Sequence, residues 1–235
     1  MVEVDRRAMH DFHVSLLQMM ENAGRSLALV ARERPFEGSV AGGRIAVLAG
    51  RGGNGGGALA AARRLAGWGA HVEVLAAAPR ARPLPETERQ ARAARAIGLA
   101  VHDVADDATW VPLEHAGAFD LVIDGLLGYG GVGTPRGAIA RLMAWAADAS
   151  TPVLALDVPS GVDATSGEVS SLAVRADATL ALAALKTGLV ATAATAHVGA
   201  LYLADIGVPA AAFAGMLAPS LVRAWFVADD VVRVT

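Results

Sequence analysis

Short, almost wholly apolar runs alternate with segments of helical periodicity along most of this chain, and this alternation constrains the fold more than any other feature. The apolar runs predict strands at 44–50, 71–77, 100–105, 119–128, 152–161, 177–186 and 199–208. Helical segments lie within 7–32, at 57–70, within 81–99 and at 138–149. Strands that are apolar on both faces, and that helices separate in sequence, form parallel sheets with helices on both sides. The pattern therefore predicts an α/β fold with a mainly parallel sheet.

Composition narrows the class of protein further. The chain has 235 residues, of which 54 % are hydrophobic, so we expect a single domain over residues 1–235. Its formal net charge is −3 without an extended basic block, which argues against binding to nucleic acid or to an anionic membrane. Cysteine is absent, which excludes disulfides and thiolate catalysis. A charged N-terminus and the lack of an apolar stretch of spanning length predict a cytoplasmic protein.

Glycine-rich and polar segments follow the predicted strands at 50–57, 124–134, 157–163 and 186–188. The carboxyl ends of parallel strands meet at one edge of a sheet, and ligands of open α/β sheets bind at that edge. These segments therefore predict one shared site.

The first of these segments belongs to the stretch LAGRGGNGGGA, residues 48–58, which has six glycines in eleven positions. Gly50, Gly52 and Gly55 fit the dinucleotide fingerprint G-x-G-x-x-G, whereas a phosphate loop of the Walker type is excluded because no Gly-Lys-Ser/Thr follows. No acid stands at the end of the next strand to hold a ribose. Arg80 and Arg82 stand there instead and leave an NADP-linked reductase open. A glycine turn needed only for close helix–strand approach is the structural alternative.

Polar side chains at the other strand ends are candidates for chemistry. Asp124 and Asp157 each end a strand and enter a turn, where an acid is often only a capping or turn residue. Ser160 lies in DVPSG rather than in a G-x-S-x-G elbow, so it is not predicted to be a nucleophile. Lys186 follows an apolar strand and would be a candidate proton donor if it were partly buried beside a carboxylate. The six histidines are scattered and show no metal-ligand spacing.

Six segments together resemble the NAD(P)H-hydrate epimerase family, the YjeF N-terminal domain. They are MMENAGRSLA (19–28), VLAGRGGNGGGALAAARRLAGWGAHVEVL (47–75), DLVIDGLLGYGGVGTPRG (120–137), LALDVPSGVDATSGEV (154–169), ADATLALAALKTGL (176–189) and LADIGVP (203–209). The resemblance runs in order from Asp5 to about Pro209, and the pair MENAG and DVPSG is its most specific part.

The resemblance implies a three-layer α/β/α Rossmann-like sandwich, usually a homodimer, often fused to a kinase-like dehydratase domain. The substrate it implies is NADH or NADPH hydrated at C6, whose R and S forms are interconverted. It also implies a potassium ion held by Asn54, Asp124 and Ser160. The substrate-binding loops map onto Gly53, Asn54, Gly55, Gly56 and Gly57, and onto Gly128, Tyr129, Gly130, Gly131, Val132, Gly133 and Thr134. Asp157 would lie beside the reacting ring and transfer protons, with Lys186 as its charge partner or an alternative donor.

The chain departs from the family in the glycine-rich segment. Where the family typically reads N-N-G-G-D-G, this chain reads Gly53-Asn54-Gly55-Gly56-Gly57-Ala58, so the first Asn and the Asp are replaced by glycine. This departure leaves a non-catalytic nucleotide-binding or interaction module on the same fold as an alternative to an active enzyme.

Overall fold

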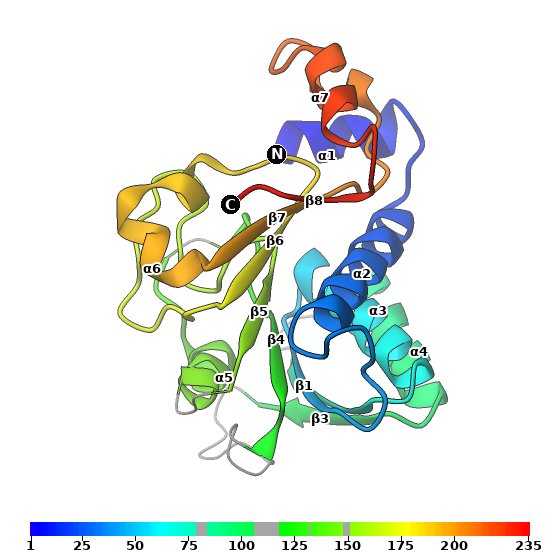
Figure 1. The fold of residues 1–235 in the computed structure, drawn as a ribbon, viewed down its shortest axis with the longest axis vertical. Coiled ribbons are helices and arrows are strands. Elements are labelled where there is room, and N and C mark those ends of the chain that lie inside the picture. Colours follow the sequence, from blue (N-terminus) through cyan, green and yellow to red (C-terminus); the bar gives the residue numbers. More distant parts are fainter. Residues whose placement is uncertain (79–83, 106–117, 132, 148–150) are drawn as a thin grey trace.

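The computed structural model describes residues 1–78, 84–105, 118–131, 133–147 and 151–235. In this part of the chain, eight strands form one sheet in the order β3-β2-β1-β4-β5-β6-β7-β8 (Figure 1). All neighbours pair in parallel except β7 and β8, which are antiparallel. The strands are β1 (Arg44–Ala49), β2 (His71–Ala77), β3 (Ala100–Val104), β4 (Leu121–Gly125), β5 (Val153–Leu156), β6 (Ala178–Leu182), β7 (Ala200–Ala204) and β8 (Val231–Arg233).

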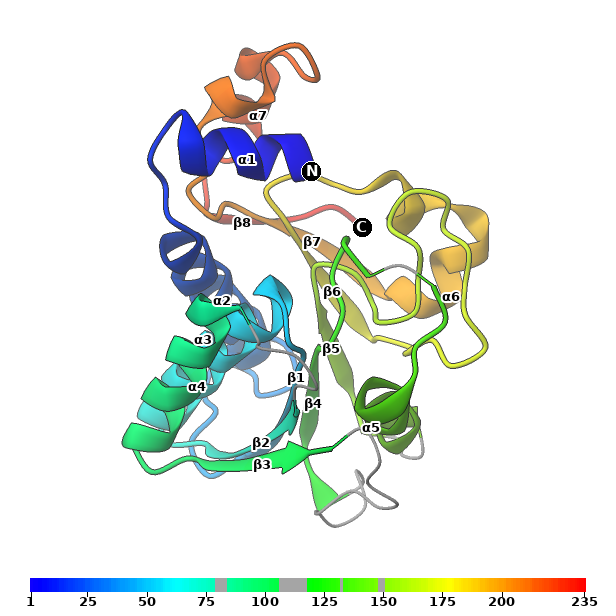
Figure 2. The same cartoon turned by 180° about the vertical axis from the view of Figure 1, so that it is seen from behind.

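Helices cover both faces of the sheet, as the view from behind also shows (Figure 2). One face carries α2, α3 and α4, the other carries α5 and α6, and α1 and α7 lie together at one end. The helices are α1 (Val2–His10), α2 (Leu16–Glu33), α3 (Gly53–Gly67), α4 (Pro85–Ala96), α5 (Gly137–Ala147), α6 (Thr195–Val198) and α7 (Pro219–Trp225). The predicted three-layer α/β/α sandwich is confirmed. Within the described residues, no helix combines the length and the apolar character needed to cross a membrane.

Strand β1 shows why the sheet is buried on both sides. Ile45 and Val47 belong to the apolar core shared with α2 and α3, whereas Ala46 and Leu48 belong to the core shared with α5. All four side chains are fully buried. The continuous apolar run is therefore the consequence of a strand whose alternate side chains enter two different cores.

Two predicted boundaries are wrong. Helix α3 begins at Gly53, four residues before the predicted start at 57, because its glycines pack against α2 and the sheet and are held helical by tertiary contacts. The run 199–208 is not the last strand, since β7 ends at Ala204 and β8 follows at Val231–Arg233. Strand β8 has three residues, too few to show a hydrophobic period.

The MENAG motif of α2 is a packing motif in this structure. Glu21 forms ion pairs with Arg63 and Arg64 of α3, and Asn22 donates to the carbonyl of Ile206 at 3.0 Å. Gly24 lies where α2 meets α3: a Cβ atom added there would be 2.5 Å from Ala60 Cβ and 2.7 Å from the Gly57 carbonyl oxygen. The motif thus fixes the distance between the two helices that cover β1.

We expect Gly24→Ala to destabilise the protein although alanine favours helices. The new methyl group would contact backbone atoms of α3 that cannot move aside, and such overpacking costs about 1–3 kcal/mol. Gly67→Ala is the matched control, because nothing lies within 4 Å of its Cβ position in α3. Urea unfolding should show a lower unfolding free energy for Gly24→Ala and no loss for Gly67→Ala. Equal effects of the two changes would contradict the close approach of the helices.

Candidate functional site

The carboxyl edge of the sheet has a crevice where the strand order reverses. From β1 the chain adds β2 and β3 on one side, whereas β4 and the later strands extend the other side. Ligands of open α/β sheets bind at this switch point. Immediately beyond the two central strands, the Gly50 N–H donates to the Gly125 carbonyl at 3.0 Å. The two predicted glycine-rich segments therefore meet at the switch point.

Most glycines of the first segment are required by the chain's own packing. A Cβ atom at Gly50 would lie 1.8 Å from the Leu126 carbonyl oxygen, and one at Gly55 would lie 1.9 Å from the Gly50 carbonyl oxygen. Gly56 and Gly57 are buried in α3, against Met20 and Leu156 respectively. Only Gly52 and Gly53 face open space or a single distant contact. Close backbone approach, the structural alternative at the sequence level, accounts for these four glycines.

Asp124 and Ser160 form a buried hydrogen-bonded pair. The Asp124 side chain is fully buried and accepts from the Ser160 hydroxyl and the Ser160 N–H, both at 2.7 Å, and from the Leu126 N–H at 3.2 Å. The Ser160 hydroxyl oxygen also accepts from the Leu127 N–H at 3.0 Å. Burial raises the pKa of the Asp124 carboxyl above its usual value, and the Ser160 hydrogen bonds oppose that rise. Among the described residues, no cationic side chain pairs with Asp124.

Asn54 joins this pair through the 126–128 segment. Its side-chain amide donates to the carbonyls of Leu127 at 2.8 Å and Leu156 at 3.0 Å. Its side-chain oxygen Oδ1 is buried and has no hydrogen-bond partner. A buried acceptor without a partner is costly unless something else satisfies it. Asn54, Asp124 and Ser160 therefore offer oxygens of the kind that bind hard cations.

Asp157 and Lys186 form a second buried pair. Their side chains are both 5 % exposed, and Lys186 Nζ donates to Asp157 Oδ1 at 2.5 Å and to the Leu182 carbonyl at 2.7 Å. Asp157 Oδ2 accepts from the Tyr129 N–H at 3.0 Å. Asp157 directly follows β5 with φ 66°, the left-handed region. This conformation costs on the order of 1 kcal/mol outside glycine.

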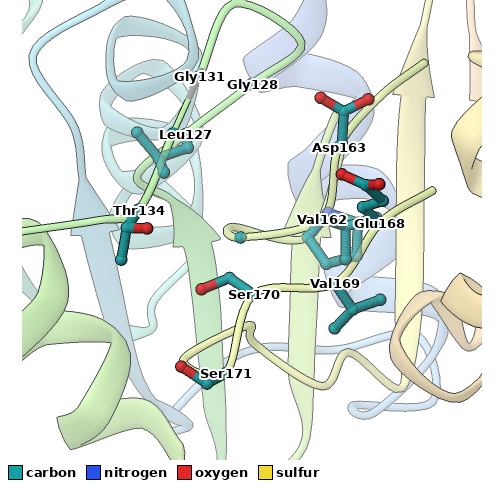
Figure 3. Close-up of a pocket in the computed structure, with 13 residues that line it drawn as sticks. Leu127, Gly128, Gly131, Thr134, Val162, Asp163, Glu168, Val169, Ser170 and Ser171 are labelled. Carbon is teal, nitrogen blue, oxygen red and sulfur yellow. The ribbon is translucent and has the colours of Figure 1, made fainter. Parts of the chain in front are cut away.

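A cavity of about 330 Å³ lies beside these pairs, between the 127–134 segment and the 159–171 segment (Figure 3). Its walls are Leu127, Gly128, Gly131, Gly133, Thr134, Pro159, Gly161, Val162, Asp163, Glu168, Val169, Ser170 and Ser171. Asp157 is not among them and lies behind Gly128: a Cβ atom on Gly128 would be 3.3 Å from both Asp157 Oδ2 and Asn54 Cγ. The Gly128 backbone thus separates the cavity from the buried pair.

The structure brings the predicted polar residues Asn54, Asp124, Asp157, Ser160 and Lys186 to one edge of the sheet. Of the predicted loop, Gly128, Gly131, Gly133 and Thr134 line the cavity. Val132, Arg80 and Arg82 lie outside the described residues.

Sequence reasoning missed two sets of residues at this edge. The first is the far wall, including Asp163, Glu168 and Ser170. Asp163 accepts from the N–H groups of Thr165 and Ser166, so its sequence pattern signals a turn but not a cavity wall. The second is Asp5, which accepts a hydrogen bond from the Tyr129 hydroxyl.

Comparisons with known proteins agree on one family. A family model described as YjeF-related protein N-terminus matches residues 16–188. An NAD(P)H-hydrate epimerase of Dehalogenimonas lykanthroporepellens is 39% identical, covering 100% of this chain and 90% of that protein. One of Rhodopirellula baltica is 36% identical, covering 88% and 82%. A bifunctional NAD(P)H-hydrate repair enzyme Nnr of Salinibacter ruber is 34% identical, and the match covers 98% of this chain and 45% of that protein. The crystal structure of yeast ynu0, YNL200c, has the same fold, with a TM-score of 0.75 at 20% identity over 99% of this chain and 96% of that one.

Lys186→Met should lower the unfolding free energy by about 3 kcal/mol, because it leaves the Asp157 carboxylate buried without its cation. Adding Asp157→Asn should recover part of that loss, since no buried charge is then left unpaired. Arg95→Met is the control: Arg95 pairs with Asp103 at the surface, where an ion pair contributes less than about 1 kcal/mol. Urea unfolding measures all of these. Equally mild effects of Lys186→Met and Arg95→Met would contradict a buried pair.

Proposed function

We propose, since this chain belongs to the family of YjeF-related protein N-termini, that it is an NAD(P)H-hydrate epimerase. The enzyme is an isomerase that interconverts the R and S forms of NADH and NADPH hydrated at C6 of the nicotinamide ring. The observation that carries the proposal is the buried pair of Asp157 and Lys186 beside a cavity at the switch point, in a chain whose epimerase relatives match it over most of their length.

The chemistry requires one group that both gives and takes a proton. The C6 hydroxyl is adjacent to a ring nitrogen, so its departure leaves a stabilised iminium, to which water can return on either face. A general acid protonates the leaving hydroxyl, and the same group, once ionised, accepts a proton from the incoming water. We assign this role to Asp157, with Lys186 holding its negative charge.

Asp157 has to become accessible for this role. Both of its carboxylate oxygens are hydrogen-bonded, and the Gly128 backbone lies between it and the cavity. We therefore infer that substrate binding displaces the 128–129 backbone from Asp157. Gly128 suits such a movement because it carries no side chain to clear past Asn54.

The proposed substrate contacts lie on both sides of the crevice. The open N–H groups at the start of α3, beginning at Gly53, suit the pyrophosphate, because helix N-termini favour anions and no side chain caps this helix. The loop from Gly128 to Thr134 would enclose the nicotinamide end. Gly55, Gly56 and Gly57 stay part of the proposed contact set through their main chain, although the contacts that the structure gives them are within the protein.

A potassium ion fits the oxygens of Asn54, Asp124 and Ser160. The unpartnered Oδ1 of Asn54 and the unpaired, fully buried carboxylate of Asp124 are the two features that support this ion. Oxygen ligands with one formal charge suit a large monovalent cation better than zinc or magnesium. When bound, the ion would neutralise Asp124 and attract the anionic substrate.

Three further properties follow from the family and are proposals for this chain. A homodimer is supported by exposed apolar side chains at one end of the molecule, among them Val2 of α1, Met216 and Leu221 of α7. A kinase-like dehydratase, fused or separate, would consume the S form; the bifunctional relatives support this partner. The cytoplasm is the proposed location, because it contains the nucleotide substrates.

The first functional prediction concerns Asp157. The protein should interconvert the R and S hydrates, followed by chromatography of the two forms. Asp157→Asn should lower kcat by about 10²–10⁴-fold, because loss of a general acid–base typically costs that much, while the Kd for the substrate changes little. Asp103→Asn, an exposed acid in β3, is the control and should keep full activity.

Two other outcomes separate the alternatives. A protein that binds the hydrates without interconverting them would be a binding module, the alternative that Gly53 and Gly57 motivate. Hydride transfer to or from intact NADP would indicate a reductase.

The second functional prediction concerns the cation. Thermal stability should rise more in potassium chloride than in lithium chloride at equal ionic strength, by up to about 2.7 kcal/mol at a hundredfold excess over Kd. Asp124→Asn should abolish the difference between the salts, and Asp103→Asn should preserve it. Equal responses of the parent protein to both salts would rule out a selective site.

A further inference from the structure

The N-terminal helix α1 contacts the candidate site through one side chain. The family match begins at residue 16, so α1 (Val2–His10) lies outside it. Asp5 of this helix nevertheless accepts a hydrogen bond from the hydroxyl of Tyr129, 124 residues away in the loop between the cavity and the buried pair. No step of the proposed chemistry uses this contact so far.

Tyr129 connects Asp5 to both members of the buried pair. Its backbone N–H donates to Asp157 Oδ2 at 3.0 Å, and Lys186 Nζ lies 5.9 Å from the centre of its ring. The positive charge of Lys186 and the negative charge of Asp157 both act on Asp5 as well. One side chain of α1 thus holds the residue whose main chain holds Asp157.

Docking of α1 does not account for this bond. Arg7 already ties the helix to the Ala214 carbonyl at 2.6 Å, and Val4 and Ala8 are buried in the same apolar cluster as Phe213. Partial burial raises the pKa of Asp5, so its carboxylate is held at a cost that a residue needed only for docking would not require. Its hydrogen bond is directed at the loop.

We propose that Asp5 is a positioning residue of the epimerase site: by holding the Tyr129 hydroxyl, it keeps the Tyr129 N–H on Asp157 and orders the 128–131 loop over the Asp157–Lys186 pair. This inference rests on the proposed epimerase function. It assigns no contact with substrate to Asp5, which acts through Tyr129.

The test compares Asp5→Ala, Asp5→Asn, Tyr129→Phe and the double variant Asp5→Ala/Tyr129→Phe by epimerase kinetics. Asp5→Ala should lower kcat roughly tenfold or more, because a hydrogen bond to a charged group is lost. Asp5→Asn can still accept a hydrogen bond and should lose less. The double variant should be no worse than either single variant, because both changes remove the same bond.

Arg7→Met is the matched control, since it removes the other polar tie of α1 and leaves Asp5 in place. It should lower thermal stability but leave kcat within about twofold of the parent, by the absence of any contact with Tyr129. A loss of kcat in Arg7→Met equal to that in Asp5→Ala would overturn the proposal and leave Asp5 a docking residue. So would an unchanged kcat in Asp5→Ala, or additive losses in the double variant.

Hydrogen–deuterium exchange gives a readout that does not depend on catalysis. The peptide that carries Tyr129 should exchange roughly tenfold faster in Asp5→Ala than in the parent or in Arg7→Met, because the loop opens more often. Unchanged exchange would refute the inference. If the parent shows no epimerisation, the proposed function fails, and the exchange rates alone decide whether Asp5 holds the loop.

Discussion

Two backbones approach each other beyond the ends of β1 and β4, and the rest of the site depends on how closely they do so. The Gly50 N–H reaches the Gly125 carbonyl, and any side chain at Gly50 would overlap the Leu126 carbonyl. This contact sets where α3 begins and where the 126–128 segment runs. The glycines at this point are therefore part of the architecture before they are part of any ligand site.

The consequence is a set of polar groups that a sheet edge alone would not assemble. Because α3 starts so close to the 126–128 segment, Asn54 reaches the carbonyls of Leu127 and Leu156. The same segment binds Ser160, which in turn binds Asp124. The strained turn at Asp157 directs its carboxylate to Lys186 and Tyr129. A structure that buries two carboxylates and a lysine within a few residues of a cavity gives up stability for function.

The sequence predicts features that depend on local pattern and misses those that depend on distant contacts. Strands β1 and β2 follow from apolar runs, and Asp124 and Asp157 are identifiable because acids stand directly at strand ends. The start of α3 is missed because glycines are helical there only through packing on α2. Asp5 carries no signal at all, since its partner is 124 residues away. The far wall of the cavity looks like an ordinary turn around Asp163 for the same reason.

The central claim is that this crevice promotes reversible loss and return of the C6 hydroxyl. Epimerisation in ¹⁸O-labelled water tests it most directly, with mass spectrometry of the hydrated nucleotide and a sample without protein as background. The account predicts that label enters the C6 position at the rate at which R and S forms interconvert, because water returns from the face opposite to the departing hydroxyl. Interconversion without label, or label entry no faster than the background, would contradict it.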